Sequence, residues 1–283
     1  MNKIAIVLII ILAACQTPQK TEKGGFIDES WINDRVASAK ERLLSDENGA
    51  KVWESIEAHG GLSSWFGNGP IRFQFDYQPL GGGTRRNTVQ TIEQWSVKAV
   101  HEVPEGDMSF GWDGSQAWIF PDTAELSVNA RFWSKTPFYF IGLPFVLADE
   151  GIKYSYLSPQ ELEGEMYDLV KVSYDQGVGD ASGDFYVIYI NQKTKLMGAL
   201  RYIVSYPGFF PNGGHSNEKF MKINSLVEVD GIQLPTGYKT YWWVDEAPEE
   251  HITNIAVSDY SFHNDLDPDF FDTPAGAKVL EGL

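Results

Sequence analysis

The chain has 283 residues, 43% of them hydrophobic, which is enough for one sizeable buried core. Its 22 basic and 39 acidic residues give a formal net charge of −17. A surface of that charge repels nucleic acids and anionic lipids, and no basic stripe in the sequence offsets it, so we expect no nucleic-acid partner.

Residues 1–14 have the composition of a secretory signal peptide. Met1, Asn2 and Lys3 make a basic start, residues 4–12 are an unbroken apolar run, and two alanines follow. The run is too short to span a membrane comfortably. We expect residues 1–14 to be removed on export, which leaves 21 basic and 39 acidic residues and a net charge of −18.

Residues 12–15 (LAAC) resemble the lipobox of bacterial lipoproteins, in which the residue matching Cys15 is acylated and becomes the mature N-terminus. Cys15 is the only cysteine, so a disulfide has no partner within the chain. Its acyl chains would anchor the protein to a membrane surface, with residues 15–25 as a lipidated polar tether. Gln16 after the cysteine resembles an outer-membrane sorting signal. The resemblance implies an outer-membrane lipoprotein of a Gram-negative cell envelope, facing the periplasm or the cell surface; an ordinary signal peptide that happens to precede a cysteine is the alternative.

Two segments near the N-terminus are predicted to be helical. Residues 26–44 have mixed helical character. In residues 48–59, Val52, Trp53 and Ile56 recur with the period of one helix face, and a pair of glycines ends the pattern. His59 shares that face, which favours a packed histidine at the helix end over a ligand-binding one.

From residue 71 the hydrophobic period changes to two, which predicts strands. The predicted strands, some of them alternating and others aromatic and β-branched, are residues 71–77, 88–103, 117–120, 151–157, 167–174, 185–190, 200–206, 220–229, 239–244 and 252–260. Asp230-Gly231 suits a tight hairpin, across which residues 220–229 should meet residues 239–244. Consecutive hairpins without crossover helices predict one α+β domain, residues 26–283. Its strongly curved antiparallel sheet would have about ten strands, with helices on the concave face.

Residues 131–147 are dense in aromatic side chains and show no alternation. The segment contains Pro137 and Pro144, which are unfavourable in a central strand and in a helix interior. We predict one or two short helices lying across a sheet face. Pro137 and Pro144 would break the segment into short pieces, and Gly142 would let the chain bend between them, so that the segment could shift as the lid or lining of a cavity.

This order of elements resembles the LolA/LolB-like superfamily of periplasmic lipoprotein carriers. The resemblance rests on an N-terminal helix before a meander, the turn at residues 111–114 (GWDG), residues 189–196 (YINQKTKL) and 229–235 (VDGIQLP), and the closing residues 266–270 (LDPDF). It implies an incomplete β-barrel that wraps over helices and leaves an apolar cavity for acyl chains. The soluble carrier of the family has no lipobox, so Cys15 implies an anchored relative.

The sequence contains none of the common catalytic or metal-binding motifs. It has no Gly-x-Ser-x-Gly elbow, no His-Glu-x-x-His and no Cys-x-x-Cys pair, so we expect no catalytic residue, metal or cofactor. His215, His251 and His263, with Asp259, could form a metal or hydrolase site only if separate loops converged. Solvated loop residues are the simpler interpretation.

Two further patterns are better explained without a ligand. Residues 177–179 (GVG) resemble a phosphate loop loosely, but they join two strands, which favours a flexible hairpin turn. Residues 265–269 begin like a calcium loop, but Phe270 and Gly276 occupy the positions that require Gly and Glu.

The nine Trp, 13 Tyr and 17 Phe exceed what a minimal core needs. With a concave sheet, they predict an aromatic-lined pocket, although core packing is the alternative for any single ring. The candidate lining residues are Phe132, Trp133, Phe138, Phe140, Phe145, Trp112, Trp118, Tyr189, Tyr202 and Trp242.

Three functions remain open from the sequence. The first is a membrane-anchored envelope lipoprotein that binds an apolar small molecule, lipid or lipoprotein acyl chain in that pocket. The second is a non-enzymatic interaction or sensory module with a filled core, which presents a surface to another envelope protein. The third and least favoured is a hydrolase.

Overall fold

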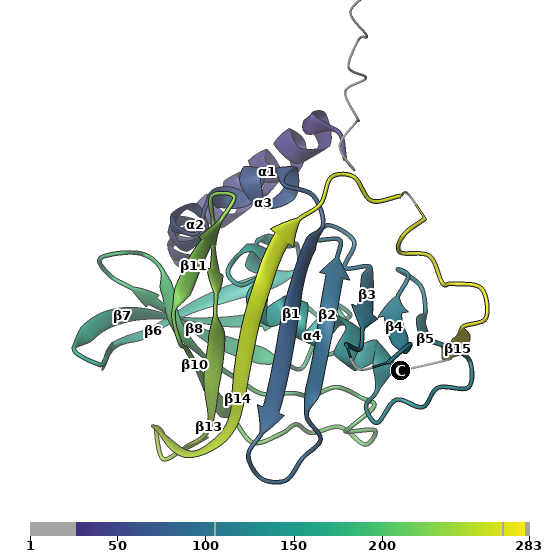
Figure 1. Ribbon diagram of the computed structural model, residues 1–283. Coiled ribbons are helices and arrows are strands. Elements are labelled where there is room, and N and C mark those ends of the chain that lie inside the picture. Colours follow the sequence, from purple (N-terminus) through teal and green to yellow (C-terminus); the bar gives the residue numbers. More distant parts are fainter. Residues whose placement is uncertain (1–26, 105, 268, 281–283) are drawn as a thin grey trace, which may run out of the picture.

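The computed structural model describes residues 27–280 except residues 105 and 268 (Figure 1). The predicted signal peptide, Cys15 and the tether up to residue 25 lie outside the described residues. The elements are α1 (Glu29–Leu44), α2 (Glu47–Ala58), α3 (Gly61–Gly67), β1 (Ile71–Pro79), β2 (Arg86–Ile92), β3 (Ala99–Glu102), β4 (Ser109–Trp112), β5 (Ala117–Phe120), α4 (Ala130–Ile141), the short 3₁₀ helix η1 (Phe145–Ala148), β6 (Ile152–Leu162), β7 (Glu165–Tyr174), β8 (Phe185–Asn191), β9 (Met197–Tyr202), β10 (Lys219–Ile223), β11 (Leu226–Val229), β12 (Ile232–Pro235), β13 (Gly237–Val244), β14 (Ala247–Phe262) and β15 (Lys278–Leu280).

Within the described residues, thirteen strands form one sheet in the order β15-β5-β4-β3-β2-β1-β14-β13-β10-β9-β8-β7-β6. Every pairing in it is antiparallel, and the two end strands do not pair with each other. Figure 1 shows α4 inside the curve of the sheet and α1–α3 together at one end. The predicted α+β fold with an open, curved antiparallel sheet, an incomplete barrel, is confirmed.

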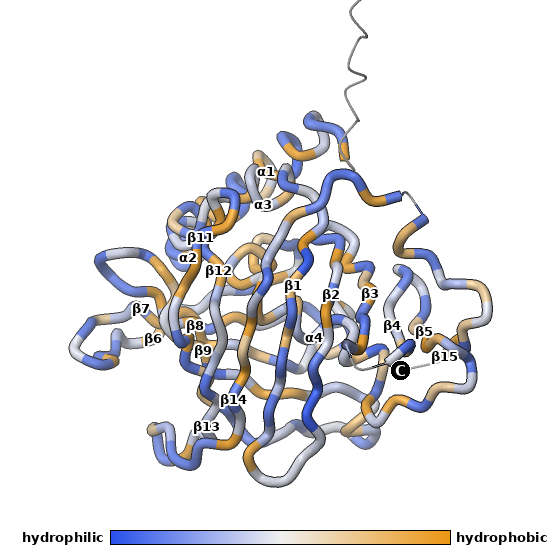
Figure 2. Tube along the Cα trace, in the orientation of Figure 1, coloured by the Kyte–Doolittle hydropathy of each residue, from blue (hydrophilic) through white to orange (hydrophobic). Residues whose placement is uncertain are grey.

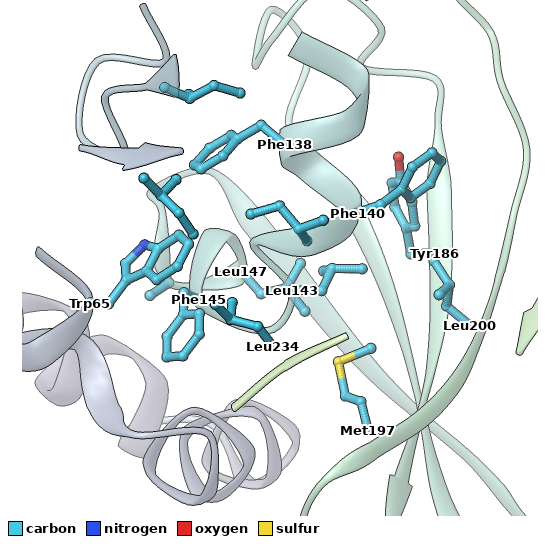
Figure 3. Close-up of a cluster of buried hydrophobic side chains, with 14 of the residues drawn as sticks. Trp65, Phe138, Phe140, Leu143, Phe145, Leu147, Tyr186, Met197, Leu200 and Leu234 are labelled. Atoms are coloured by element: carbon cyan, nitrogen blue, oxygen red, sulfur yellow. The ribbon is translucent and has the colours of Figure 1, made fainter. Parts of the chain in front are cut away.

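The main core lies between the concave face of the sheet and the helices. Along β1, Ile71, Phe73 and Phe75 are almost fully buried and alternate with more exposed polar residues. Figure 2 shows the hydropathy of β1 and of the rest of the sheet. On the helical side, Trp65 of α3 and Phe138 of α4 meet the same core (Figure 3). Burial of such aromatic side chains is the largest favourable contribution to a fold of this kind.

A second, smaller hydrophobic cluster lies on the other face of the sheet. It contains Leu169, Val187, Tyr189, Ala199 and Phe220. The alternation of β8 explains its position, because the even-numbered residues of that strand join the main core and the odd-numbered ones face away from it. The turn between β6 and β7 helps to cover the cluster, since its Glu163 forms an ion pair with Lys222 of β10.

The tight turn at Asp230-Gly231 forms, but between different strands from those predicted. Asp230 and Gly231 have φ values of +48° and +80°, as a two-residue hairpin requires. They join β11 to β12, which form a separate two-stranded sheet, while β10 pairs directly with β13. The run at residues 88–103 is likewise divided, because Glu93 N–H and Lys98 C=O close a turn between β2 and β3.

Pro137 does not break the aromatic segment. It lies inside α4, where a proline costs roughly 3 kcal/mol, and the burial of Trp133, Phe138 and Ile141 on that helix offsets the cost. The helix ends after Ile141, where the N–H of the C-cap Gly142 donates to the carbonyl of Phe138 at 2.7 Å, and η1 follows from Phe145. The predicted short helices are therefore present, but the prediction that Pro137 separates them is wrong.

Candidate functional site

A half-open cavity of about 410 Å³ lies between α4, strands β8 and β9, and the β7–β8 loop, residues 175–184. This volume is within the range of small-molecule sites in proteins. Phe132, Thr136 and Tyr139 of α4 recur at the spacing of one helix face and form one wall. The opposite face of α4, with Trp133 and Ile141, packs into the core, so the helix cannot rotate its apolar wall away from the cavity.

Two tyrosines from neighbouring strands form the opposite wall. Tyr186 of β8 and Tyr202 of β9 are cross-strand partners, and their rings stack with centroids 5.9 Å apart. The ring centroids of Tyr139 of α4 and Tyr186 are 5.2 Å apart. Burial raises the pKa of all three hydroxyls above the usual value, so they stay protonated and can donate hydrogen bonds at neutral pH.

The inner end of the cavity is almost wholly apolar. Trp65 stacks on Phe145 at a centroid distance of 4.6 Å and on Phe138 at 6.1 Å (Figure 3). Gln94 also lines this end, and its Nε2 donates to the carbonyls of Trp65 at 3.2 Å and Gly69 at 2.6 Å. Among the described residues, its Oε1 has no hydrogen-bond partner. The cavity can therefore accommodate an apolar group that carries few polar atoms.

The mouth of the cavity carries a cluster of charges. Asp180 of the β7–β8 loop accepts hydrogen bonds from Arg131 Nε at 3.0 Å and Nη2 at 2.8 Å, and from Lys135. The Arg131 guanidinium lowers the pKa of Asp180 to about 2, with a further contribution from Lys135. Trp112 supports both cations, which lie 4.7 and 4.4 Å from its ring centroid.

Six of the ten candidate lining residues lie around this cavity. They are Phe132, Phe138, Phe140, Phe145, Trp112 and Tyr202. Five come from strand β9 or the aromatic segment at residues 131–147, and Trp112 ends β4. The structure thus brings together side chains that are up to 90 residues apart in sequence, from Trp112 to Tyr202.

The other four candidates lie elsewhere. Strand and helix periodicity turns three of them away, whereas Trp242 shares the face of Tyr202 but lies two strands further along the sheet. Trp133 contacts Tyr77 at 5.3 Å on the core side of α4, and Tyr189 belongs to the cluster on the outer face of β8. Trp118 crosses over Gly111, its cross-strand partner, whereas its neighbours in β5 enter the main core. Trp242 packs under Lys219, with Nζ 5.2 Å from its ring centroid.

Several lining residues were not predicted from the sequence. Tyr139 and Tyr186 could have been found, since each keeps the period of an element already recognised. Trp65 and the loop residues Val178–Ala181 could not, because only the folded chain brings them beside α4. Residues 177–179 do form part of a loop between two strands, and that loop covers one side of the cavity.

The histidines considered for a hydrolase make separate contacts. His215 Nδ1 lies 2.7 Å from the carbonyl of Ser216, and His251 stacks on the ring of Tyr241. His263 Nε2 lies 2.9 Å from Ser261 Oγ. Within residues 27–280, leaving aside 105 and 268, no group of three or more His, Cys, Asp or Glu side chains could hold a metal. In the same part of the chain, no helix is long and apolar enough to cross a membrane.

No protein-family model matches the chain, and no curated protein sequence does. Among solved structures, a LolA superfamily protein from Nitrosomonas europaea matches with a TM-score of 0.51 at 9% identity, over 78% of this chain and 96% of that one. The chain has a LolA-like fold.

Two other solved structures show a weaker likeness. One is a putative outer membrane lipoprotein-sorting protein domain from Vibrio parahaemolyticus, with a TM-score of 0.42 at 10% identity over 85% of this chain and 97% of that one. The other is a DUF1329 family protein from Desulfovibrio piger, with a TM-score of 0.47 at 11% identity over 80% and 98%. The LolA-like fold predicted from the turn signals is confirmed; at these identities the comparison concerns the fold alone.

Proposed function

We propose that this chain is a non-enzymatic envelope lipoprotein that binds an apolar ligand, a lipid or an acyl chain, in the cavity beside α4. The single observation that carries the proposal is the cavity itself, about 410 Å³ and lined mainly by aromatic and aliphatic side chains. A solved structure with the same fold is described as a LolA superfamily protein, which agrees with a carrier or binding role. The alternative, an interaction or sensory module with a filled core, does not account for a cavity of this size.

A cavity-filling variant tests this function. Thr136→Phe adds a ring to the α4 wall and should weaken the binding of N-phenyl-1-naphthylamine, an uncharged fluorescent probe, by about tenfold, or ~1.4 kcal/mol. Thr123→Phe adds the same ring at an exposed position and should leave the affinity unchanged. If the wild-type protein does not bind the probe, the proposal is wrong, and an interaction module without a ligand is the better description.

The proposed location depends on Cys15, which lies outside the described residues. We expect Cys15→Ser to move the protein from the membrane fraction to the soluble fraction, because the acyl chains that anchor it would be missing. Cell fractionation with intact-mass measurement checks this. Retention in the membrane fraction with an unchanged mass would argue against lipidation at Cys15.

A further inference from the structure

Two basic side chains of α4 form a cationic site at the mouth of the cavity. Arg131 and Lys135 are four residues apart, one helical turn, and Lys135 lines the cavity. Both are held against the ring of Trp112 by cation–π contacts. In a chain with 22 basic and 39 acidic residues, two adjacent cations, one of which lines the cavity, mark a place where negative charge is bound.

The negative charge at this site is supplied by the chain itself. Asp180 receives two hydrogen bonds from the Arg131 guanidinium, at 3.0 and 2.8 Å, and a third bond from Lys135. Two bonds from one guanidinium are the arrangement in which arginine recognises the carboxylate or phosphate of a ligand. Asp180 therefore occupies an anion site that is already assembled on α4.

No residue of the loop that carries Asp180, residues 175–184, belongs to either hydrophobic cluster. Gly177 and Gly179 have φ values of +85° and +66°, and a Cβ at either position would meet nothing within 4 Å. Glycine is therefore used there for its backbone conformation and not for close packing. Val178, Asp180 and Ala181 line the cavity, so displacement of the loop would widen its mouth.

We propose that the ligand of this cavity is an amphiphile with an anionic headgroup, a carboxylate or a phosphate. The headgroup replaces Asp180 on Arg131 and Lys135, and the apolar chain enters the aromatic part of the cavity. This inference rests on the proposed function and adds the chemical class of the ligand. Asp180 then competes with the ligand headgroup for Arg131 and Lys135, and its loop closes the mouth when no ligand is present.

The other charged groups that face the cavity leave this site cationic. Asp149 is paired with Arg35 at 2.6 Å. Asp184, which accepts hydrogen bonds from the N–H and the hydroxyl of Ser205, keeps its negative charge and offsets only one of the two cations. Once Asp180 is displaced, Arg131 and Lys135 carry two positive charges at the mouth. The acidic surface of the protein repels anions from a distance, but salt at physiological concentration screens that repulsion beyond about 8 Å.

A headgroup series with equal chain lengths tests the inference. Dodecanoate, dodecyl phosphate and uncharged monolauroylglycerol would each displace N-phenyl-1-naphthylamine from the wild-type protein, Asp180→Asn and Asp175→Asn. Asp175, at the start of the same loop, pairs with Lys153 and not with Arg131. Asp175→Asn is therefore a control that removes one negative charge from the loop without changing the partners of Arg131. Asp180→Asn should bind the anions about tenfold tighter, if Asp180 occupies Arg131 and Lys135 about ten times as often as it leaves them free. Monolauroylglycerol has no charge that competes with Asp180 and should bind as before. Asp175→Asn should behave as wild type.

The outcomes separate the headgroup assignment from the function. Adding Arg131→Gln to Asp180→Asn should remove the gain for both anions, and a gain for only one anion would identify the headgroup. An equal gain for all three ligands would mean that the loop is only a steric cover, and the headgroup assignment would be wrong. The assignment also fails if Asp180→Asn binds the anions no tighter than wild type. Absence of probe binding in every protein would instead overturn the proposed function.

Discussion

Replacing Phe145 with alanine is expected to lower the free energy of unfolding by about 3–5 kcal/mol. The Phe145 side chain is 2% exposed, and its ring stacks on Trp65 with centroids 4.6 Å apart. The contact joins η1 to α3, so truncation leaves a space that the surrounding rings cannot close without moving both helices. Urea denaturation of the two proteins, with an unchanged m-value, measures the difference.

Phe132→Ala is the matched variant from the other end of the same aromatic segment. Phe132 is only partly buried, and it contacts the rings of Tyr206 and Phe209 at 5.0 and 4.9 Å beside the cavity mouth. We expect a smaller loss of about 1–2 kcal/mol, accompanied by weaker binding of the apolar probe. Equal losses of stability in the two variants would contradict the division of this segment into a core end and a mouth end.

Acidification from pH 6.5 to about pH 4 is expected to destabilise the protein by up to about 2.7 kcal/mol per pH unit. The cause is two buried histidines. Burial lowers the pKa of His59 from 6.5 to about 4 and that of His101 from 6.5 to about 3. Below pH 6.5 the unfolded chain binds a proton on each imidazole while the folded chain does not, so stability that is complete above pH 6.5 is lost as the pH falls.

A single histidine variant tests this explanation, and two carboxyl groups with raised pKa values modify the expected curve. Equilibrium unfolding at several pH values should give a slope about half as steep for His59→Gln, because one proton is then no longer taken up on unfolding. Burial raises the pKa of Asp149 and Asp184, so proton uptake by the folded protein flattens the curve at its acidic end. A wild-type slope that His59→Gln does not change would show that this histidine does not contribute.

The sequence was a good guide where a local pattern decides the structure. The predicted strand runs formed β1, β8 and β14, and Asp230-Gly231 produced the tight turn that its dihedral preferences require. His59, predicted to pack at a helix end, is buried there with Nδ1 2.8 Å from the carbonyl of Ser55. Each of these outcomes depends on residues close together in the chain.

Long-range packing decided the features that were missed. Pro137 remains in α4 because several aromatic residues on that helix are buried together, which no count of helix breakers takes into account. Tyr189 was predicted as a cavity residue because it is aromatic and lies in a strand, but its parity in β8 places it on the outer face. The ion pairs of Asp180 join positions 45 and 49 residues apart, and no motif in the sequence links them.

The strand order also fixes when the sheet can be completed. The middle of the sheet is the pair β1 and β14, in which Ile71 lies opposite Phe262. On a chain made from its N-terminus, β1–β5 and β6–β10 can form two independent meanders, but the edge of β1 that pairs with β14 must wait for the residues synthesised almost last. Until then each meander has an unpaired inner edge, the kind of edge at which strands of different molecules join. A shortened chain that lacks β14 is thus not a smaller version of this protein but two open sheets with a tendency to aggregate.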